Sequence, residues 1–295
     1  VYLQMKRLLL TILIVAATNT VANASGIGLK FPPTARSYAL GESLVANSKT
    51  GAEAIYFNPA GLSNINLNSL EFSAFDGVSD IAYNSLSYFK NIQPNTGLGV
   101  SLGMLNAGEE TINELDGSAR SISTMKDTYL TLAAGKKITP DIDAGLSLKI
   151  ISSNLAEEYK ANGFAVDMGI LYSQVWNDLP ISIGASLQNI GTGLKYEKKS
   201  NSLPTNIRIG GAVTVEGMEF MAAVNKDKNG VKIGLGAEYY PLSYLALRAG
   251  YKTGYANQGL SLGFGITRKN IGFDYAYCPI TDLDSNHRVS MGIRF

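Results

Sequence analysis

The sequence predicts an all-β protein, a transmembrane antiparallel up-and-down β-barrel of about 14 strands preceded by a short N-terminal helical hatch. Runs in which apolar and polar residues alternate recur along most of the chain, and this is the period of a half-buried β-strand. Short connections alternate with longer ones along the chain, as in outer-membrane barrels. The last run, at 288–295, closes the chain, and a barrel needs its last strand to pair with its first.

The first residues have the pattern of a secretory signal peptide. Residues 5–7 are Met-Lys-Arg, residues 8–17 are apolar apart from one threonine, and the Ala-Asn-Ala at 22–24 fits a cleavage site. A membrane anchor is the alternative, but the apolar run has only about half of the roughly 20 residues that a spanning helix needs. We therefore expect a signal peptide at 1–24, with residues 1–4 as an upstream start extension.

Composition limits the partners of the remaining chain. The formal net charge of +1 argues against nucleic acid and against a polybasic membrane surface. Cys278 is the only cysteine, so an exported chain has no internal disulfide framework. We expect residues 25–295 to form one outer-membrane barrel domain, with a hatch segment at 25–68 and the strands at 69–295. Its expected partners are outer-membrane lipid and the outer-membrane assembly machinery, with no cofactor.

Strands are expected wherever the alternation continues for most of a membrane crossing, which takes about 9–11 residues. Regular runs lie at 98–104, 142–150, 164–172, 181–187, 231–239, 260–266, 271–277 and 288–295. Less regular runs lie at 69–75, 81–89, 127–138, 206–215, 218–226 and 245–253. Long loops are expected at 109–126, 152–163, 191–205 and 279–286.

Small residues and charges of both signs stand between the apolar residues of these runs. In a barrel this second face lines the lumen. Because many of its residues are glycine or serine, volume is left for something to fill, and we expect a plugged or narrow lumen rather than an open pore. Tyrosines near the strand ends, Tyr83 and Tyr129 among them, are expected in the aromatic girdles at the two membrane interfaces, with ordinary strand propensity as the alternative.

Residues 34–62 differ from everything after them because they lack a period of two and are rich in helix formers. Asn58 stands before Pro59, which disfavours helix at Asn58, and Gly61 allows a tight reversal. The segment is therefore expected to be a short helical or irregular element just ahead of the first strand. It is close enough to that strand to enter the lumen.

This segment also carries a resemblance. Ala35-Arg36 followed by Gly41, and then the block at 54–62, Ala-Ile-Tyr-Phe-Asn-Pro-Ala-Gly-Leu, resemble the N-terminal motif of the FadL-like outer-membrane barrels, and among these the compact PorV/PorQ family. The resemblance implies a barrel of about 14 strands with a hatch in its lumen. It assigns hatch or ligand roles to Arg36, Asn58, Pro59, Ala60 and Gly61, with the alternative that these residues only brace the first strand. The chain departs from the family at residues 41–43 and 49–51.

The resemblance implies a protein without enzymatic activity, and two functions follow from it. The first is an accessory in protein export at the outer membrane, with secretion-system proteins as partners. The alternative is a FadL-like diffusion channel for long-chain fatty acids or other hydrophobic small molecules. The chain lacks the long extracellular insertions of the fatty-acid transporters, which favours the first. A transporter should instead place apolar lumen-facing residues near Asn58.

Catalytic and metal sites find little support in the sequence. His287 is the only histidine, and at a junction between loop and strand it is better explained as a solvated side chain than as part of a catalytic triad. The oxygen-rich residues 282–286 lack the glycine and the distal glutamate of a calcium loop. One histidine and one cysteine do not make a zinc site.

The terminal strand predicts where the protein resides. Val289, Met291 and Ile293 should face lipid and Arg288 and Ser290 the lumen. The terminal aromatic, Phe295, resembles the C-terminal signal by which barrel proteins are recognised for membrane assembly. We therefore expect the outer membrane of a diderm bacterium.

Overall fold

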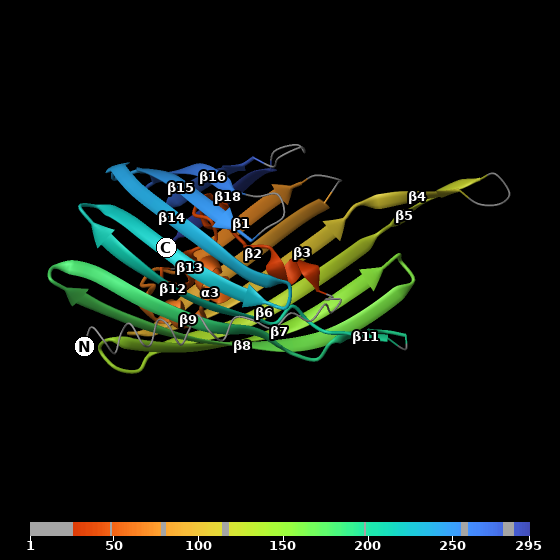
Figure 1. Ribbon diagram of the computed structural model, residues 1–295, viewed down its shortest axis with the longest axis horizontal. Helices are drawn as coiled ribbons and strands as arrows, with labels where there is room; N and C mark the ends of the chain where they lie inside the picture. The colour runs from red at the N-terminus through yellow and green to blue at the C-terminus, as the bar shows by residue number, and fades with distance from the viewer. Residues whose placement is uncertain are drawn as a thin grey trace.

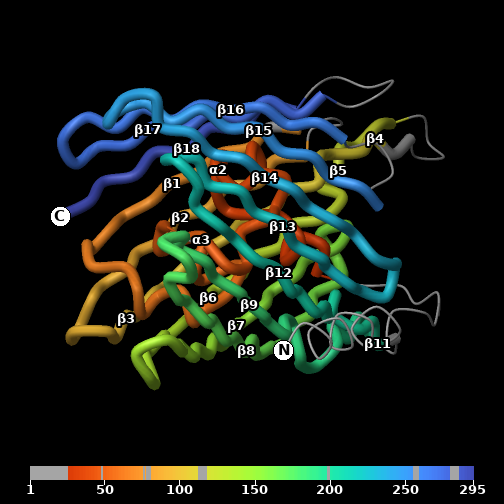
Figure 2. Tube along the Cα trace, turned by 60° about the vertical axis from the view of Figure 1, so that its left-hand side comes forward, coloured from red at the N-terminus to blue at the C-terminus, as the bar shows by residue number. Residues whose placement is uncertain are grey.

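The computed structural model describes residues 26–47, 49–77, 81–113, 118–197, 199–254, 259–279 and 286–295. Within them the chain forms a closed barrel of antiparallel strands, with helical elements in its interior (Figures 1 and 2). The expected signal peptide lies outside the described residues. No helix among those residues has the length and apolar character to cross a bilayer.

Fourteen strands close the barrel, which confirms the predicted fold class. In chain order they are β1 (Ser69–Asp76), β2 (Ile81–Gln93), β3 (Thr96–Ala107), β6 (Met125–Lys137), β7 (Ile142–Leu155), β8 (Tyr159–Trp176), β9 (Leu179–Gly191), β12 (Asn206–Val215), β13 (Met218–Asp227), β14 (Gly230–Leu242), β15 (Leu245–Thr253), β16 (Leu260–Arg268), β17 (Ile271–Cys278) and β18 (Asn286–Arg294).

The last strand pairs with the first, as expected. The register of β18 on β1 runs from Ser69 opposite Arg294 to Asp76 opposite His287. Past the end of β18, the backbone N–H of Phe295 donates to the carbonyl of Asn68 at 3.0 Å. Closure therefore leaves neither β1 nor β18 with a free edge, which a bilayer would penalise heavily.

The two faces of the strands divide as the alternation predicts. On β18, Met291 is 52% exposed on the outside of the barrel, whereas Arg288 is 2% exposed on the inside. The exposed apolar side chains lie on the outward face of strand after strand, where hydrocarbon would take the place of a protein core. Buried glycines, serines and charged side chains fill the inward face.

The two ends of the barrel differ in their connections. At one end, here the short-turn end, the strands are joined by turns at 94–95, 138–141, 177–178, 216–217, 243–244 and 269–270. At the other, the loop end, two extra hairpins extend from the wall: β4 (Glu109–Asn113) with β5 (Ala119–Ser123), and β10 (Leu194–Tyr196) with β11 (Lys199–Asn201). Figure 1 shows β4 and β5 projecting beyond the rest of the barrel.

The prediction of a long loop at 152–163 is wrong. β7 and β8 continue through this segment and are joined only by residues 156–158, where Ala156 and Glu157 adopt left-handed φ values of 52° and 62°. The segment is polar, and Ser153 donates to Asp127 on the neighbouring strand. An outward face that does not contact an apolar phase needs no apolar side chains. The alternation of apolar and polar residues can therefore end before the strand ends.

The N-terminal segment forms five short elements: η1 (Ile27–Lys30), α2 (Ala35–Ala39), η2 (Leu44–Ala46), α3 (Gly51–Phe57) and η3 (Pro59–Asn64). Thr34 and Thr50 cap α2 and α3, each side chain accepting from the backbone N–H three residues later. Asn58 is extended, ends α3 and caps η3, with Pro59 at the first position of that helix. We call residues 26–64 the hatch. Figure 2 shows it inside the ring of strands.

Candidate functional site

A transverse row of glycines on the inner wall receives the end of the hatch. Gly97, Gly135, Gly145 and Gly169 stand directly opposite one another on the adjacent strands β3, β6, β7 and β8. A methyl group at any of them would overlap residues 58–62 or a side chain packed beside them, and at Gly145 it would strike the backbone of Pro59 and Ala60. The absence of side chains therefore lets backbone pack on backbone, and we call this row the glycine floor.

Asn58 attaches the hatch to the floor. Its side-chain amide donates to the carbonyl of Val45 within the hatch and to that of Ile170 on β8, both at 2.9 Å. Its side-chain oxygen accepts from the N–H of Ala60 at 3.2 Å. The Asn-Pro-Ala-Gly block singled out in the sequence thus lies together on the glycine floor, buried throughout.

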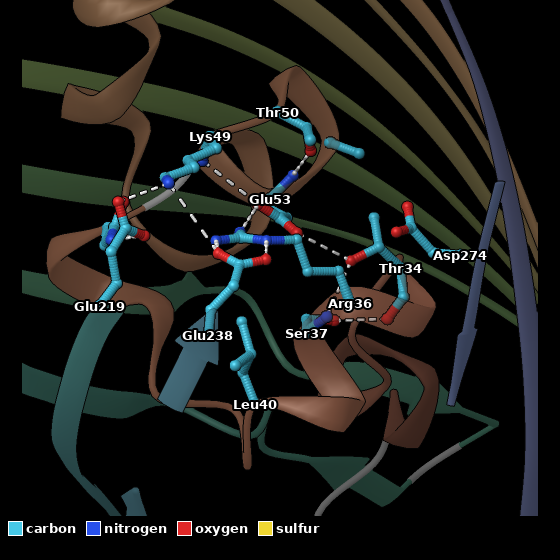
Figure 3. A network of polar contacts seen from close by, with 12 residues as sticks. Thr34, Arg36, Ser37, Leu40, Lys49, Thr50, Glu53, Glu219, Glu238 and Asp274 are labelled. Atoms are coloured by element: carbon cyan, nitrogen blue, oxygen red, sulfur yellow. Dashed lines mark hydrogen bonds and ion pairs between the residues drawn. The ribbon is translucent and has the colours of Figure 1, made fainter. Parts of the chain in front are cut away.

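Arg36, the fifth residue of the predicted set, attaches the hatch to the opposite wall. It lies on α2 between two carboxylates (Figure 3). Its Nε and one terminal nitrogen donate to Glu238 of β14 at 2.9 and 2.6 Å, and its other nitrogen donates to Glu53 of α3 at 2.6 Å. Arg36 is 3% exposed, Glu238 1% and Glu53 0%, so these charges are buried away from water. We call Arg36, Glu53 and Glu238 the latch.

Further charges surround the latch. Arg248 of β15 donates to Glu238 at 2.7 Å and to Asp274 of β17 at 2.6 Å. Lys49 of the hatch pairs with Glu219 of β13 at 2.5 Å. Glu53 also accepts from the hydroxyl of Thr34 at 3.1 Å. The network therefore joins two hatch helices and Lys49 to four wall strands, β13, β14, β15 and β17.

Arg36 stays charged over the whole physiological range. Burial alone lowers the pKa of Arg36, but the carboxylates of Glu238 and Glu53 outweigh it and hold that pKa well above its ordinary value. Replacing such a pair by apolar groups can be neutral, but removing one partner leaves a buried charge without compensation. Loss of one charge of the latch therefore destabilises the buried charges that remain.

A polar cavity lies beside the latch at the short-turn end. Its volume is about 600 Å³, and its lining includes Arg36, Glu53, Tyr240, Arg248, Asp274 and Arg294. Mixed charges in a wide cavity favour water over an apolar ligand. We call it the vestibule.

The loop end of the lumen is apolar instead. Leu29 of η1 is buried there, and Phe31 stacks on Tyr83 with ring centroids 5.5 Å apart. The N–H of Gly28 donates to the hydroxyl of Tyr129 at 3.0 Å, and Lys30 pairs with Asp227 at 3.2 Å. We define the mouth cluster by the buried residues of the wall and of the connection between β9 and β12: Phe75, Tyr83, Leu105, Tyr129, Ile151, Ala161, Ala165, Leu194 and Leu203.

The mouth cluster bears on two points of the sequence analysis. The largest group of apolar lumen-facing side chains lies on the loop side around Leu29, whereas smaller groups lie beside the Asn58 block, with Phe89 against Leu62 and Leu171 against Ala60. Tyr83 and Tyr129, expected in the outer girdles, point into the lumen. The sequence position of Tyr83 indicates this direction, because every second residue of a strand points to the same face and Tyr83 alternates with the buried serines Ser85 and Ser87.

The other candidate groups have plainer surroundings. His287 is exposed on the outer face, where its Nδ1 lies 2.6 Å from the hydroxyl of Tyr275. Among the described residues no cluster of side chains could hold a metal ion. Most of the segment 282–286 lies outside those residues.

Comparisons with known proteins relate the chain to channels by fold alone. No family model and no curated protein matches it. Among solved structures, it is similar to a mutant of the monoaromatic hydrocarbon channel TodX with a TM-score of 0.66, 13% identity, and coverage of 88% of this chain and 98% of that one. The Ralstonia pickettii toluene transporter TbuX has a TM-score of 0.63 and 16% identity, and the match covers 89% of this chain and 98% of that one. A Pseudomonas aeruginosa FadL homologue has a TM-score of 0.58 and 11% identity, with coverage of 93% of this chain and 99% of that one.

These likenesses support part of the expected resemblance. The fold is similar to that of a FadL homologue and of the hydrocarbon channel TodX, which agrees with the expected resemblance at the level of fold. The finer expectation, membership of the PorV/PorQ family, is not supported. Two of these similar structures are described as a channel and a transporter.

Proposed function

We propose that the protein is an outer-membrane channel through which hydrophobic small molecules pass, with the loop end outside the cell and the short-turn end facing the periplasm. The observation that carries this proposal is the mouth cluster. It is an apolar, lumen-facing site at the loop end, and the side chains of Leu29 and Phe31 from the chain's own N-terminal segment occupy it.

A hydrophobic ligand can take the place of these two side chains. Burying a leucine or phenylalanine side chain contributes roughly 1.5–3 kcal/mol, so their displacement costs a similar amount each. A molecule of comparable apolar area recovers that cost by covering the same wall residues. A polar molecule does not, which gives the site its selectivity.

The hatch then governs passage to the vestibule. It is attached to one wall by Asn58 on the glycine floor and to the other by the latch. Both attachments lie between the mouth cluster and the short-turn end, so a ligand leaves toward the periplasm only when one of them yields. Arg36, Asn58, Pro59, Ala60 and Gly61 are, in this proposal, residues that hold the gate closed.

The similar solved structures support this function over protein export. Their names describe channels and transporters for toluene and monoaromatic hydrocarbons. The export hypothesis, with secretion-system partners, stays a prediction that none of the comparisons supports. Insertion by the outer-membrane assembly machinery also stays a prediction.

The function can be tested by dye uptake in a Gram-negative host whose own hydrophobic channels have been deleted. N-phenylnaphthylamine, an apolar dye that an intact outer membrane excludes, should enter cells carrying the protein faster than cells carrying an empty vector. Sensitivity to a large polar antibiotic should stay unchanged, because the hatch fills the lumen. Equal dye uptake with the protein present in the outer membrane would overturn the proposal, and so would a parallel rise in antibiotic sensitivity.

A further inference from the structure

A shallow pocket lies on the outer surface of the barrel, at the short-turn end of the hairpin formed by β16 and β17. Its volume is about 640 Å³. Ile266 stands opposite Phe273 and Arg268 opposite Ile271, and all four belong to the outward face. Phe264 packs against Phe273 with ring centroids 6.4 Å apart and supports the far side of the pocket.

The pocket is apolar toward the membrane and basic toward the water. Arg268 ends the lipid-facing face of β16, and Lys269 follows it in the turn. Among the described residues neither of these two cations forms an ion pair. A long basic side chain at this depth covers apolar surface with its stem and presents its charge to the interface.

Other turns at the same end carry the opposite charge. Asp141, Asp178 and Glu216 lie in the turns from β6 to β7, β8 to β9 and β12 to β13. The end of β16 and the turn after it carry Arg268 and Lys269 with no acidic residue, so the pocket lies at a locally basic part of this rim. Such a site attracts an anion at the interface.

We propose that this pocket binds an anionic phospholipid of the leaflet at the short-turn end. Arg268 and Lys269 hold the phosphate, and an acyl chain lies over Ile266, Ile271 and Phe273. Guanidinium and ammonium groups are the usual partners of phosphate, and the apolar lining fits a hydrocarbon chain. The proposal requires that the barrel lie in a membrane, but it does not depend on transport.

Native mass spectrometry of the detergent-purified protein tests the site. Titrated with phosphatidylglycerol, the wild type should retain one lipid more tightly than it retains phosphatidylcholine. R268Q/K269Q should weaken the phosphatidylglycerol complex at least about tenfold, since each basic residue near an anionic surface contributes roughly a factor of five. The matched control K90Q/K136Q removes two exposed lysines at the short-turn ends of β2 and β6, outside the pocket, and should leave the complex unchanged.

Several results would overturn the assignment. Equal retention of the two lipids by the wild type would remove the role of charge, and this comparison needs no variant. An equal loss in both double variants would show a general effect of basic residues rather than a site. Competition by millimolar inorganic phosphate that removes the lipid fully would indicate a phosphate site without a lipid component.

Discussion

Arg36 and Glu238 form a two-pronged ion pair of 2.9 and 2.6 Å across 202 residues of sequence. One partner belongs to a hatch helix and the other to the inner wall of β14, so the pair joins the plug to the barrel. Parallel hydrogen bonds between guanidinium and carboxylate restrict orientation as well as distance. The pair therefore positions α2 in the lumen, and the third bond of Arg36, to Glu53, positions α3 against it.

Arg36→Ala should release the hatch from β14. The substitution leaves the carboxylates of Glu53 and Glu238 buried without their main cation, which costs about 3–5 kcal/mol. Amide hydrogen exchange in α3 and η3, followed by mass spectrometry, should accelerate by roughly a hundredfold or more.

Lys49→Gln provides the control for this change. Lys49 belongs to the same network, but its side chain is 35% exposed, so its loss should cost less than about 1 kcal/mol. Exchange in α3 and η3 that is equally slow in Arg36→Ala and Lys49→Gln would contradict the latch.

Gly145→Ala should lift the hatch off the glycine floor. The added methyl group meets the backbone of Pro59 and Ala60, which cannot rotate away as a side chain could, and overpacking of this kind costs about 1–3 kcal/mol. We expect a lower unfolding temperature and a rise in single-channel conductance in a planar bilayer. Gly272→Ala adds the same methyl group on the lumen face, where the nearest atom is 3.7 Å away, and should change neither. An unaltered conductance in Gly145→Ala would argue against a closed plug.

The double variant L29A/F31A should admit ligand more readily. Removing most of both side chains lowers the cost of displacing the N-terminal segment from the mouth cluster by about 2 kcal/mol or more, equivalent to at least about a tenfold gain in apparent affinity. N-phenylnaphthylamine uptake at low dye concentration measures this gain. The control L146A/F164A truncates the same residue types on the lipid-facing surface and should leave uptake unchanged. Slower uptake in L29A/F31A would mean that Leu29 and Phe31 belong to the ligand site instead of competing for it.

Deletion of Phe295 should reduce the amount of assembled barrel rather than its activity. Its N–H bonds the carbonyl of Asn68, and its ring stacks on Tyr88 with centroids 6.5 Å apart, so it ties β18 to both β1 and β2 at the closing seam. Heat-modifiable migration in outer-membrane fractions measures assembly. Phe72→Ala, which shortens an exposed ring on β1, is the control. Normal assembly combined with lost uptake would refute the role as an assembly signal.

How far the sequence could predict the structure varies from element to element. On β18 the alternation alone identified Arg288 as inward and Met291 as outward, because side-chain direction in a strand has a strict period of two. At 152–163 it failed, because β7 and β8 continue beyond the residues in which apolar and polar side chains alternate. For Tyr83, residue type suggested the girdle whereas its position in the alternation indicated the lumen, and the position was correct.

The barrel, the faces of its strands and the presence of a segment unlike them could be predicted from local patterns, since these features depend on the period of side-chain direction and on turn chemistry. The same patterns singled out Asn58 and Arg36, but not the groups that these residues contact. That Asn58 rests with its neighbours on four glycines from four strands, and that Arg36 meets Glu238, became visible only in the folded structure. Local patterns carry no information about which distant residues meet, because those contacts arise only when closure of the barrel brings the strands around the hatch.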